Sequence, residues 1–333
     1  MKRCHSFRFL RKDVVYIFLG VSVGLNMFLL WQRTPTGTGN KNEHLIKDED
    51  EHVRKFYIFP FLQGGLGNLM FQYASVYGIA KSNGVEIGLY SDNELYKIFE
   101  LIPPTVKERR VYFKAHRFIG SNKECAYDAR NIDIPKQKDV VHLSFLQSWK
   151  YFADVEHDIR KQYVFRKEIR DAADDLIKKQ INKYRTFVNH KLTIVGVHVR
   201  RGDYLDKDKQ RFGYRIADAD YFHRTMSFFR SKYGHVLFMI FTNPEDDDMT
   251  WCKSNLSGND VVFMFGNPRG VDLCILSRCD HVITSVGTFG WWAAFLNNGT
   301  KTYFRDFVKP GSDYEQCFKD NGYDYFYPGW LGF

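Results

Sequence analysis

The feature that most constrains the fold is the alternation of short apolar runs with helical segments from residue 192 to residue 307. Continuous apolar strands separated by helices are typical of a parallel sheet that is covered on both faces. Such a doubly wound sheet binds its ligands at the carboxyl ends of its strands. The predicted strands are 192–199, 235–242, 260–265, 281–285 and 301–307. The predicted helices are 217–233, 244–256, 271–279 and 288–298.

The first half of the chain has a weaker version of the same pattern. A strand at 55–62, a glycine turn, a helix at 69–84 and a strand at 85–90 open it. The pattern gives no assignment for 91–138. A strand at 139–146 and helices from residue 152 to about residue 184 complete this half. The predicted fold is therefore α/β, with two halves and a cleft between them.

A basic N-terminus precedes residues 14–31, which carry no charge. As a helix this segment would span about 27 Å, near the minimum for crossing a bilayer. A cleaved signal peptide is the alternative, but its apolar region is usually shorter, and no small-residue cleavage site follows here. We therefore expect a cytosolic tail at 1–13, a transmembrane signal anchor at 14–31 and a luminal stem at 32–55, because positive charge stays on the cytosolic side.

The net charge of +9 gives no reason to expect nucleic-acid binding. The first 33 residues contain six cations and one acid, so the remaining 300 carry only +4. The predicted luminal part contains two N-glycosylation sequons, at Asn255 and Asn298. It also contains five cysteines, which cannot all pair and have no zinc-site spacing, so we expect disulfides or buried thiols. These are Cys125, Cys252, Cys274, Cys279 and Cys317.

Polar residues gather where the strand 192–199 ends, in the stretch HVRRGDY. In a buried strand His198 and Arg200 project to the same side, and Arg201 and Asp203 follow in the turn. Arginine binds phosphate through paired N–H donors, so two adjacent arginines suggest a diphosphate ligand, with Asp203 orienting one guanidinium. A structural salt bridge explains any single Arg–Asp pair. The gathering of four polar residues at one strand end favours a binding site.

The glycine turn QGGLGN joins a strand to a helix in the first half. Its glycines, Gly64, Gly65 and Gly67, permit positive φ and close approach of the backbone to an anion, and Asn68 is expected to cap the helix. A simple tight turn is the alternative. The dinucleotide pattern GxGxxG is incomplete because Met70 occupies the third glycine position, which disfavours a nicotinamide oxidoreductase.

A second glycine turn, SVGTFG, follows the strand 281–285. Ser285, Thr288 and the N-terminus of the next helix could hold the same phosphates from the opposite side. Later in that helix, Trp291 and Trp292 are expected to pack in the core.

Together these stretches resemble the α-1,2-fucosyltransferases. GGLGN followed by MFQYA, then HVRRGDY and SVGTFGWWAAFL, occur in the order and spacing of that family. NPEDDDMTWC and YPGWLGF look like further landmarks. The resemblance covers roughly residues 56–333. The chain departs from the common pattern at Leu69, where glutamine is frequent, and matches little at 91–138.

The resemblance implies a single-pass type II enzyme of the Golgi membrane with a GT-B-like fold of two Rossmann-like halves. The half at 56–190 would face the acceptor, and the half at 191–333 would bind the donor. Fucose would pass from GDP-β-L-fucose to the 2-hydroxyl of a galactose or similar terminal sugar, with inversion. The implied partners are the donor, this glycan and, through 14–31, the lipid bilayer. Arg200 and Asp203 would be catalytic. The residues expected to bind the donor are His198, Arg200, Arg201, Gly64, Gly65, Gly67, Asn68, Ser285 and Thr288.

Three adjacent acids, 246–248, raise the question of a metal ion. They stand at the start of a predicted helix, where acids favour the helix dipole, and they are an incomplete site for a hard cation. The resemblance implies that no metal or other cofactor is needed, so Arg200 would stabilise the departing diphosphate. The general base is open among Asp203, Asp206 and the three acids.

Two other functions are compatible with the sequence. One is a transferase that uses another nucleotide sugar or modifies another hydroxyl. The other, of a different class, is a membrane-anchored carbohydrate-binding protein that has lost turnover.

Overall fold

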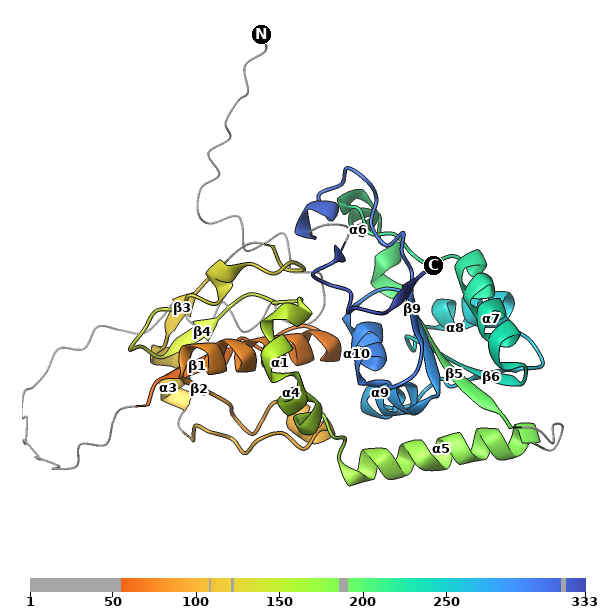
Figure 1. The fold of residues 1–333 in the computed structure, drawn as a ribbon, viewed down its shortest axis with the longest axis horizontal. Helices are drawn as coiled ribbons and strands as arrows, with labels where there is room; N and C mark the ends of the chain where they lie inside the picture. Colours follow the sequence, from red (N-terminus) through yellow and green to blue (C-terminus); the bar gives the residue numbers. More distant parts are fainter. Residues whose placement is uncertain (1–54, 108, 121–122, 186–190, 319–321) are drawn as a thin grey trace, which may run out of the picture. The chain divides into compact units, whose positions relative to one another are not determined.

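The structure is a computed structural model that describes residues 55–107, 109–120, 123–185, 191–318 and 322–333 (Figure 1). The predicted tail, the predicted membrane anchor and nearly all of the stem lie outside these residues. Within the described ranges, no helix is both long enough and apolar enough to cross a bilayer. The compact unit Arg54–Phe333 contains two parallel sheets.

The larger sheet has the strand order β10-β9-β8-β5-β6-β7, with parallel pairing throughout. From β5 the chain adds β6 and β7 on one side, and then β8, β9 and β10 on the other. A doubly wound sheet has its ligand crevice where the strand order reverses, which is between β5 and β8 here. The strands are β5 (Thr193–Val199), β6 (Val236–Thr242), β7 (Val261–Phe263), β8 (His281–Thr284), β9 (Lys301–Tyr303) and β10 (Leu331–Gly332).

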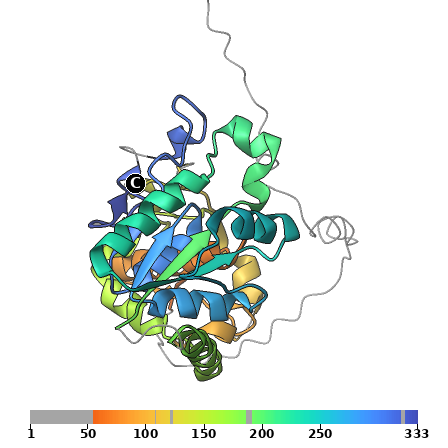
Figure 2. The same ribbon diagram turned by 90° about the vertical axis from the view of Figure 1, so that its right-hand side faces the viewer.

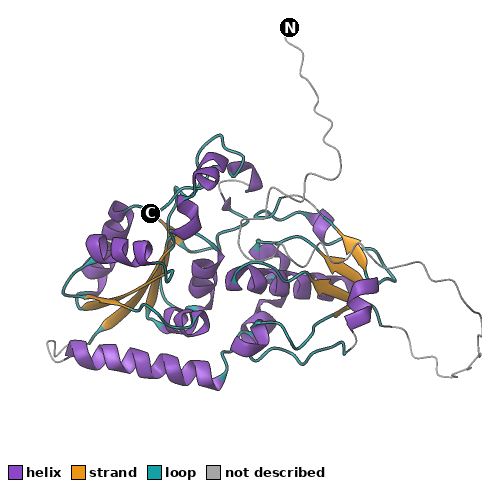
Figure 3. Cartoon of the chain, turned by 180° about the vertical axis from the view of Figure 1, so that it is seen from behind, coloured by secondary structure: helices purple, strands orange, loops and turns teal. Residues whose placement is uncertain are grey.

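Helices cover both faces of the larger sheet (Figures 2 and 3). Helices α7 (Ala219–Tyr233) and α8 (Asp246–Leu256) contact each other and β6. Helices α9 (Arg269–Arg278) and α10 (Thr288–Leu296) contact each other, and they pack on β5 and β8 respectively. Because crossovers between parallel strands are right-handed, the reversal of strand order moves the second pair to the opposite face.

The smaller sheet has the order β2-β1-β4-β3 and is also parallel. Its strands are β1 (Tyr57–Pro60), β2 (Glu86–Ile87), β3 (His116–Phe118) and β4 (Val140–His142). The remaining α-helices are α1 (Leu66–Asn83), α2 (Leu95–Ile98), α3 (Arg109–Lys114), α4 (Glu156–Gln162), α5 (Lys167–Arg185) and α6 (Lys207–Phe212). Short 3-10 helices cover Ala129–Asn131, Trp149–Tyr151, Ala153–Val155, Gly202–Leu205 and Glu315–Cys317.

The prediction of an α/β fold with parallel sheets is confirmed. The helices and strands that the sequence did not predict are short: α2, α3 and β3 lie within 91–138, α6 has six residues, and β10 has two. Runs of two to six residues are too short to show a hydrophobic period. The proposed boundary at residue 190 stays a prediction, and α5, which precedes it, packs against α9.

Helices α1 and α10 pack directly against each other and join the two sheets. Trp291 and Trp292 are buried between them, as predicted, and the Trp292 ring lies 5.0 Å from that of Phe71. The Trp292 indole N–H donates to the Gly67 carbonyl at 3.0 Å. Gly67 itself touches the backbone of Thr288, so closely that an added Cβ would lie 2.5 Å from the Thr288 carbonyl carbon. Only glycine allows this approach.

We therefore predict that Gly67→Ala lowers the free energy of unfolding by about 3 kcal/mol, because two backbones must move apart. The matched control is Gly65→Ala, since a Cβ there would meet nothing within 4 Å. It should cost under about 1 kcal/mol, the advantage of glycine over alanine at an N-cap. Urea unfolding followed by tryptophan fluorescence measures both. Equal losses in the two variants would contradict the proposed contact.

Candidate active site

Arg200 stands at the reversal point of the larger sheet, directly after β5. Its backbone N–H donates to the Ser285 hydroxyl at 2.8 Å, which ties the end of β5 to the end of β8. Its guanidinium forms an ion pair with Asp203 and lies 5.4 Å from the centre of the Tyr204 ring. The Arg200 side chain is 29% exposed and that of Asp203 is 47% exposed. A partly buried cation, held by a carboxylate, therefore lies at the edge where a doubly wound sheet binds ligands.

His198 lies beneath this cation and is buried. Its Nδ1 has no hydrogen-bond partner among the described residues, and a Cβ added at Gly290 of α10 would lie 2.6 Å from it. Burial, and secondarily the charge of Arg200, lower the pKa of His198 to about 3. The imidazole is therefore neutral at physiological pH, and the positive charge of this pair belongs to Arg200.

Arg201 points to a different environment from that of Arg200. Its guanidinium stacks on the Trp251 ring at 4.1 Å, and desolvation lowers its pKa. Beside it, the buried Asp248 carboxylate accepts a hydrogen bond from the Gly202 N–H at 2.8 Å, and burial raises the Asp248 pKa. The last of the three adjacent acids thus holds the turn that carries Arg200 and Asp203. Among the described residues, no group of three His, Cys, Asp or Glu side chains could hold a metal ion.

The turn QGGLGN meets the turn after β8. The Asn68 Oδ1 accepts hydrogen bonds from the Thr288 hydroxyl at 2.8 Å and from the Gln147 amide at 3.2 Å. The prediction that Asn68 caps the helix is wrong, because Gly65 occupies the N-cap and Asn68 lies inside the first turn of α1. Its oxygen contacts the other helix instead. The structure thus brings all three predicted stretches together.

The N-termini of α1 and α10 both lack a side-chain cap. Their N-cap residues are Gly65 and Gly287, and neither makes a side-chain hydrogen bond to its helix. Gly287 has φ +87°, a conformation that favours glycine, and a Cβ there would lie 3.8 Å from Arg200 Cγ. Free backbone N–H groups at a helix start attract anions. Two such helix starts, joined at Gly67 and Thr288, therefore lie close to the Arg200 side chain.

The sequence analysis missed the loop after β4. Leu146 is buried with φ +53°, which is rare outside glycine and often marks a functional segment. The Glu124 carboxylate accepts from the Phe145 N–H at 2.7 Å, and burial raises the Glu124 pKa. Gln147, which directly follows Leu146, makes the contact to Asn68 described above. The available signal was position, because polar residues follow a strand at its carboxyl end.

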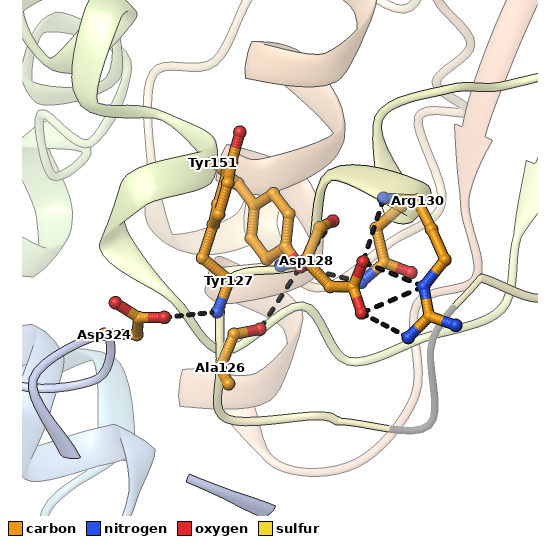
Figure 4. Close-up of polar contacts among 7 residues, drawn as sticks. Ala126, Tyr127, Asp128, Arg130, Tyr151 and Asp324 are labelled. Carbon is orange, nitrogen blue, oxygen red and sulfur yellow. Dashed lines mark hydrogen bonds and ion pairs between the residues drawn. The ribbon is translucent and has the colours of Figure 1, made fainter. Parts of the chain in front are cut away.

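A buried carboxylate joins this loop to the C-terminal region (Figure 4). Asp324 is 1% exposed and accepts from the Tyr127 N–H at 3.1 Å, while its other oxygen pairs with Lys150. Its carbonyl accepts from the Ser148 hydroxyl at 2.6 Å. In the same region, the Tyr151 hydroxyl accepts a hydrogen bond from the Asp128 N–H at 2.9 Å. These bonds fix the segment that carries Gln147.

The predicted glycosylation sites differ in their surroundings. Asn298 is exposed just after α10, whereas Asn255 is half-buried and its amide donates to the Trp251 carbonyl at 2.8 Å. The five cysteines of the described residues are all free thiols, and Cys317 alone among them is not buried. Of the two expected states, disulfide or buried thiol, the structure shows the thiol.

A model of glycosyl transferase family 11 matches residues 30–333. The chain belongs to this family. This confirms the resemblance carried by the three motifs, and the protein is a glycosyltransferase. It is 31% identical over 287 residues to human galactoside alpha-(1,2)-fucosyltransferase 1, which covers 83% of this chain and 74% of that protein. It is 30% identical over 279 residues to bovine galactoside 2-alpha-L-fucosyltransferase SEC1, covering 81% of this chain and 72% of that protein.

Solved structures show a more distant likeness. The fucosyltransferase NodZ from Bradyrhizobium superimposes with a TM-score of 0.48 at 16% identity, over 74% of this chain and 93% of that one. At this TM-score the likeness says nothing about the active site of the family 11 enzyme.

We predict that His198 makes the enzyme less stable in acid. Its folded pKa lies below the unfolded value, so its contribution is complete above about pH 6.5 and is lost as the pH falls toward 3. Between pH 7 and pH 5 the His198→Gln variant should lose up to about 2 kcal/mol less unfolding free energy than the wild type. Urea unfolding at both pH values measures this. His223→Gln, on an exposed position of α7, is the control, and equal pH responses of His198→Gln and wild type would refute the assignment.

Proposed function

We propose that this family 11 enzyme transfers L-fucose from GDP-β-L-fucose to the 2-hydroxyl of a galactose-type acceptor on a glycan. Two observations support the linkage and the acceptor class. The relatives at 30–31% identity are named as galactoside α-1,2-fucosyltransferases, and the similarity spans more than four-fifths of this chain. The family to which the chain belongs supports the transferase class.

The observation that carries the donor proposal is the meeting of one cation with two uncapped helix N-termini. Arg200 lies beside Gly287, and the starts of α1 and α10 touch at Gly67 and Thr288. A diphosphate is the ligand that this arrangement suits, because it can accept from backbone N–H groups and from a forked guanidinium together. In the proposed complex His198, Arg201, Gly64 and Ser285 complete the donor surroundings, and Asn68 holds the Thr288 hydroxyl in place.

The proposed chemistry is a single inverting displacement without a metal ion. As the bond between fucose and phosphate breaks, the sugar becomes positively charged and the leaving GDP gains negative charge. A preorganised Arg200 guanidinium stabilises that developing charge, which is the role that a divalent cation has in other transferases. The acceptor hydroxyl attacks the anomeric carbon and gives its proton to a base. Asp203, half exposed beside Arg200, is our candidate for this base.

The architecture that we propose is GT-B-like, with acceptor and donor sides at 56–190 and 191–333. The smaller sheet, with β1 to β4, and the larger sheet, with β5 to β10, support this division. We further propose a type II protein of the Golgi membrane with a luminal catalytic region and a glycan at Asn298. The uncharged segment 14–31 with its preceding cations, and the exposure of Asn298, support this location.

The full-length protein in detergent, given a panel of labelled nucleotide sugars and lactose as acceptor, should use GDP-fucose alone and should form the 2-linked product. Product analysis by mass spectrometry and NMR checks the donor and the linkage. Transfer from another donor would overturn the proposal, and GDP-fucose binding without any product would favour a carbohydrate-binding protein.

Excess EDTA should leave the rate of fucose transfer unchanged, because Arg200 supplies the cation. Activity lost in EDTA and restored by Mn²⁺ would overturn the metal-independent mechanism.

Arg200→Lys should lower kcat by about 10²- to 10³-fold, because lysine keeps the charge but loses the forked contact. Arg211→Lys is the matched control, since Arg211 pairs with Asp208 on the exposed surface of α6. Fucose transfer is measured for both, with thermal unfolding as a check that both variants fold. A folded Arg200→Lys variant with near-normal kcat would remove Arg200 from the mechanism.

A further inference from the structure

A polar pocket lies at the edge of the larger sheet opposite the candidate active site. Helix α10 begins at Thr288, in the active site, and its other end contributes Phe295 to this pocket. Thr288 and Phe295 are seven residues apart along this helix, which separates them by about 10 Å. Strand β9 likewise begins here, at Lys301. The cavity has a volume of about 400 Å³ and is separate from the residues assigned to GDP-fucose.

The pocket has more positive charge than its acids can balance. Lys301 is half-buried, and its ammonium group has no hydrogen bond or ion pair within the described part of the chain. Desolvation, and then the charge of Arg160, lower the Lys301 pKa. Lys232 lines the same pocket and also lacks an acidic partner among the described residues. Arg160 is already satisfied, since its guanidinium donates to Glu156 at 2.7 Å and to the Phe295 carbonyl at 2.8 Å.

An unpaired, half-buried ammonium group costs free energy unless an anion joins it. The nearby acids do not fill this role. Glu156 is shared between Arg160 and the Tyr327 hydroxyl. Asp280, which lines the adjoining pocket, accepts from the Ile194 N–H at 2.7 Å. The charge of Lys301 is therefore available to a ligand.

Aromatic rings form the other wall of the pocket. Trp330 and Tyr327, from the terminal motif YPGWLGF, line it, whereas the Phe295 ring is 1% exposed and is covered by the Arg160 guanidinium at 4.1 Å. Trp330 is half-buried, and its neighbour Leu331 is 41% exposed. A flat aromatic surface beside a cation suits a ligand with an apolar face and an acidic group, since each ring buries apolar area while its edge stays wet. A pyranose ring that carries a carboxylate has both features.

We propose that this pocket binds an acidic sugar residue, with its carboxylate on Lys301 and Lys232 and its ring on Trp330. The site is distinct from the catalytic site. It would bind an acidic residue in one part of a glycan while, under the proposed function, Arg200 acts at the catalytic site on another part. Binding at two points of one ligand raises affinity through effective concentration, without a change in the catalytic residues.

The test titrates the full-length protein in detergent with glucuronate, and with glucose as the matched neutral sugar. Trp330 lies in the pocket, so tryptophan fluorescence and calorimetry should both report glucuronate binding, with glucose giving no response. Lys301→Gln should weaken glucuronate binding by about tenfold or more, the loss expected for a charge-assisted contact. Lys178→Gln, on an exposed position of α5, should leave it unchanged.

A sulfate titration separates an acidic-sugar site from a plain anion site. Sulfate that binds as tightly as glucuronate and depends equally on Lys301 would overturn the sugar assignment. Absence of glucuronate binding, or equal binding by wild type and Lys301→Gln, would overturn the site altogether. Fucose transfer to lactose should be the same in Lys301→Gln and wild type, so failure here and failure of the proposed function can be told apart.

Discussion

The structure depends on one close contact, between the backbones of Gly67 and Thr288. It joins the first turn of α1, which belongs to the smaller sheet, to the first turn of α10, which covers the larger one. The buried tryptophans and the bond from Trp292 to the Gly67 carbonyl hold the two helices at that distance. The same contact also has a chemical effect, because it brings the unpaired backbone N–H groups of the two helix starts to one place.

Of the three basic residues near this contact, Arg200 is the one whose positive charge lies close to the helix starts. Burial keeps His198 neutral, and Arg201 is stacked on Trp251, so Arg200 is the guanidinium at the end of β5 that lies beside both Ser285 and Gly287. Its ion pair with Asp203 limits its movement before any ligand arrives. Preorganisation of this kind is what makes a fixed charge effective in catalysis, because little reorganisation is needed as charge develops.

The local sequence predicted the strands and helices that have a clear hydrophobic period. It did not predict the roles of side chains whose partners lie far away in the sequence. The strands β5, β6 and β8 and the helices around them followed from apolar runs, as did burial of Trp291 and Trp292. The role of Asp248 could not follow, because its partner is the Gly202 N–H, 46 residues away. Asn68 looked like a cap, yet its partner Thr288 is 220 residues distant. Leu146 was missed because a positive φ outside glycine has no sequence signature, and Gln147 was missed because its partner Asn68 is 79 residues away.

The free thiols have a consequence for how this chain must be made. Cys125, Cys252, Cys274 and Cys279 are buried and chemically quiet while the fold is intact, since burial raises their pKa and disfavours the reactive thiolate. In an oxidising compartment an unfolded or half-folded chain would expose them to random cross-linking. If the catalytic region is luminal, as we propose, its core has to form faster than its thiols are oxidised, and the rate of core formation rather than a disulfide protects the finished molecule.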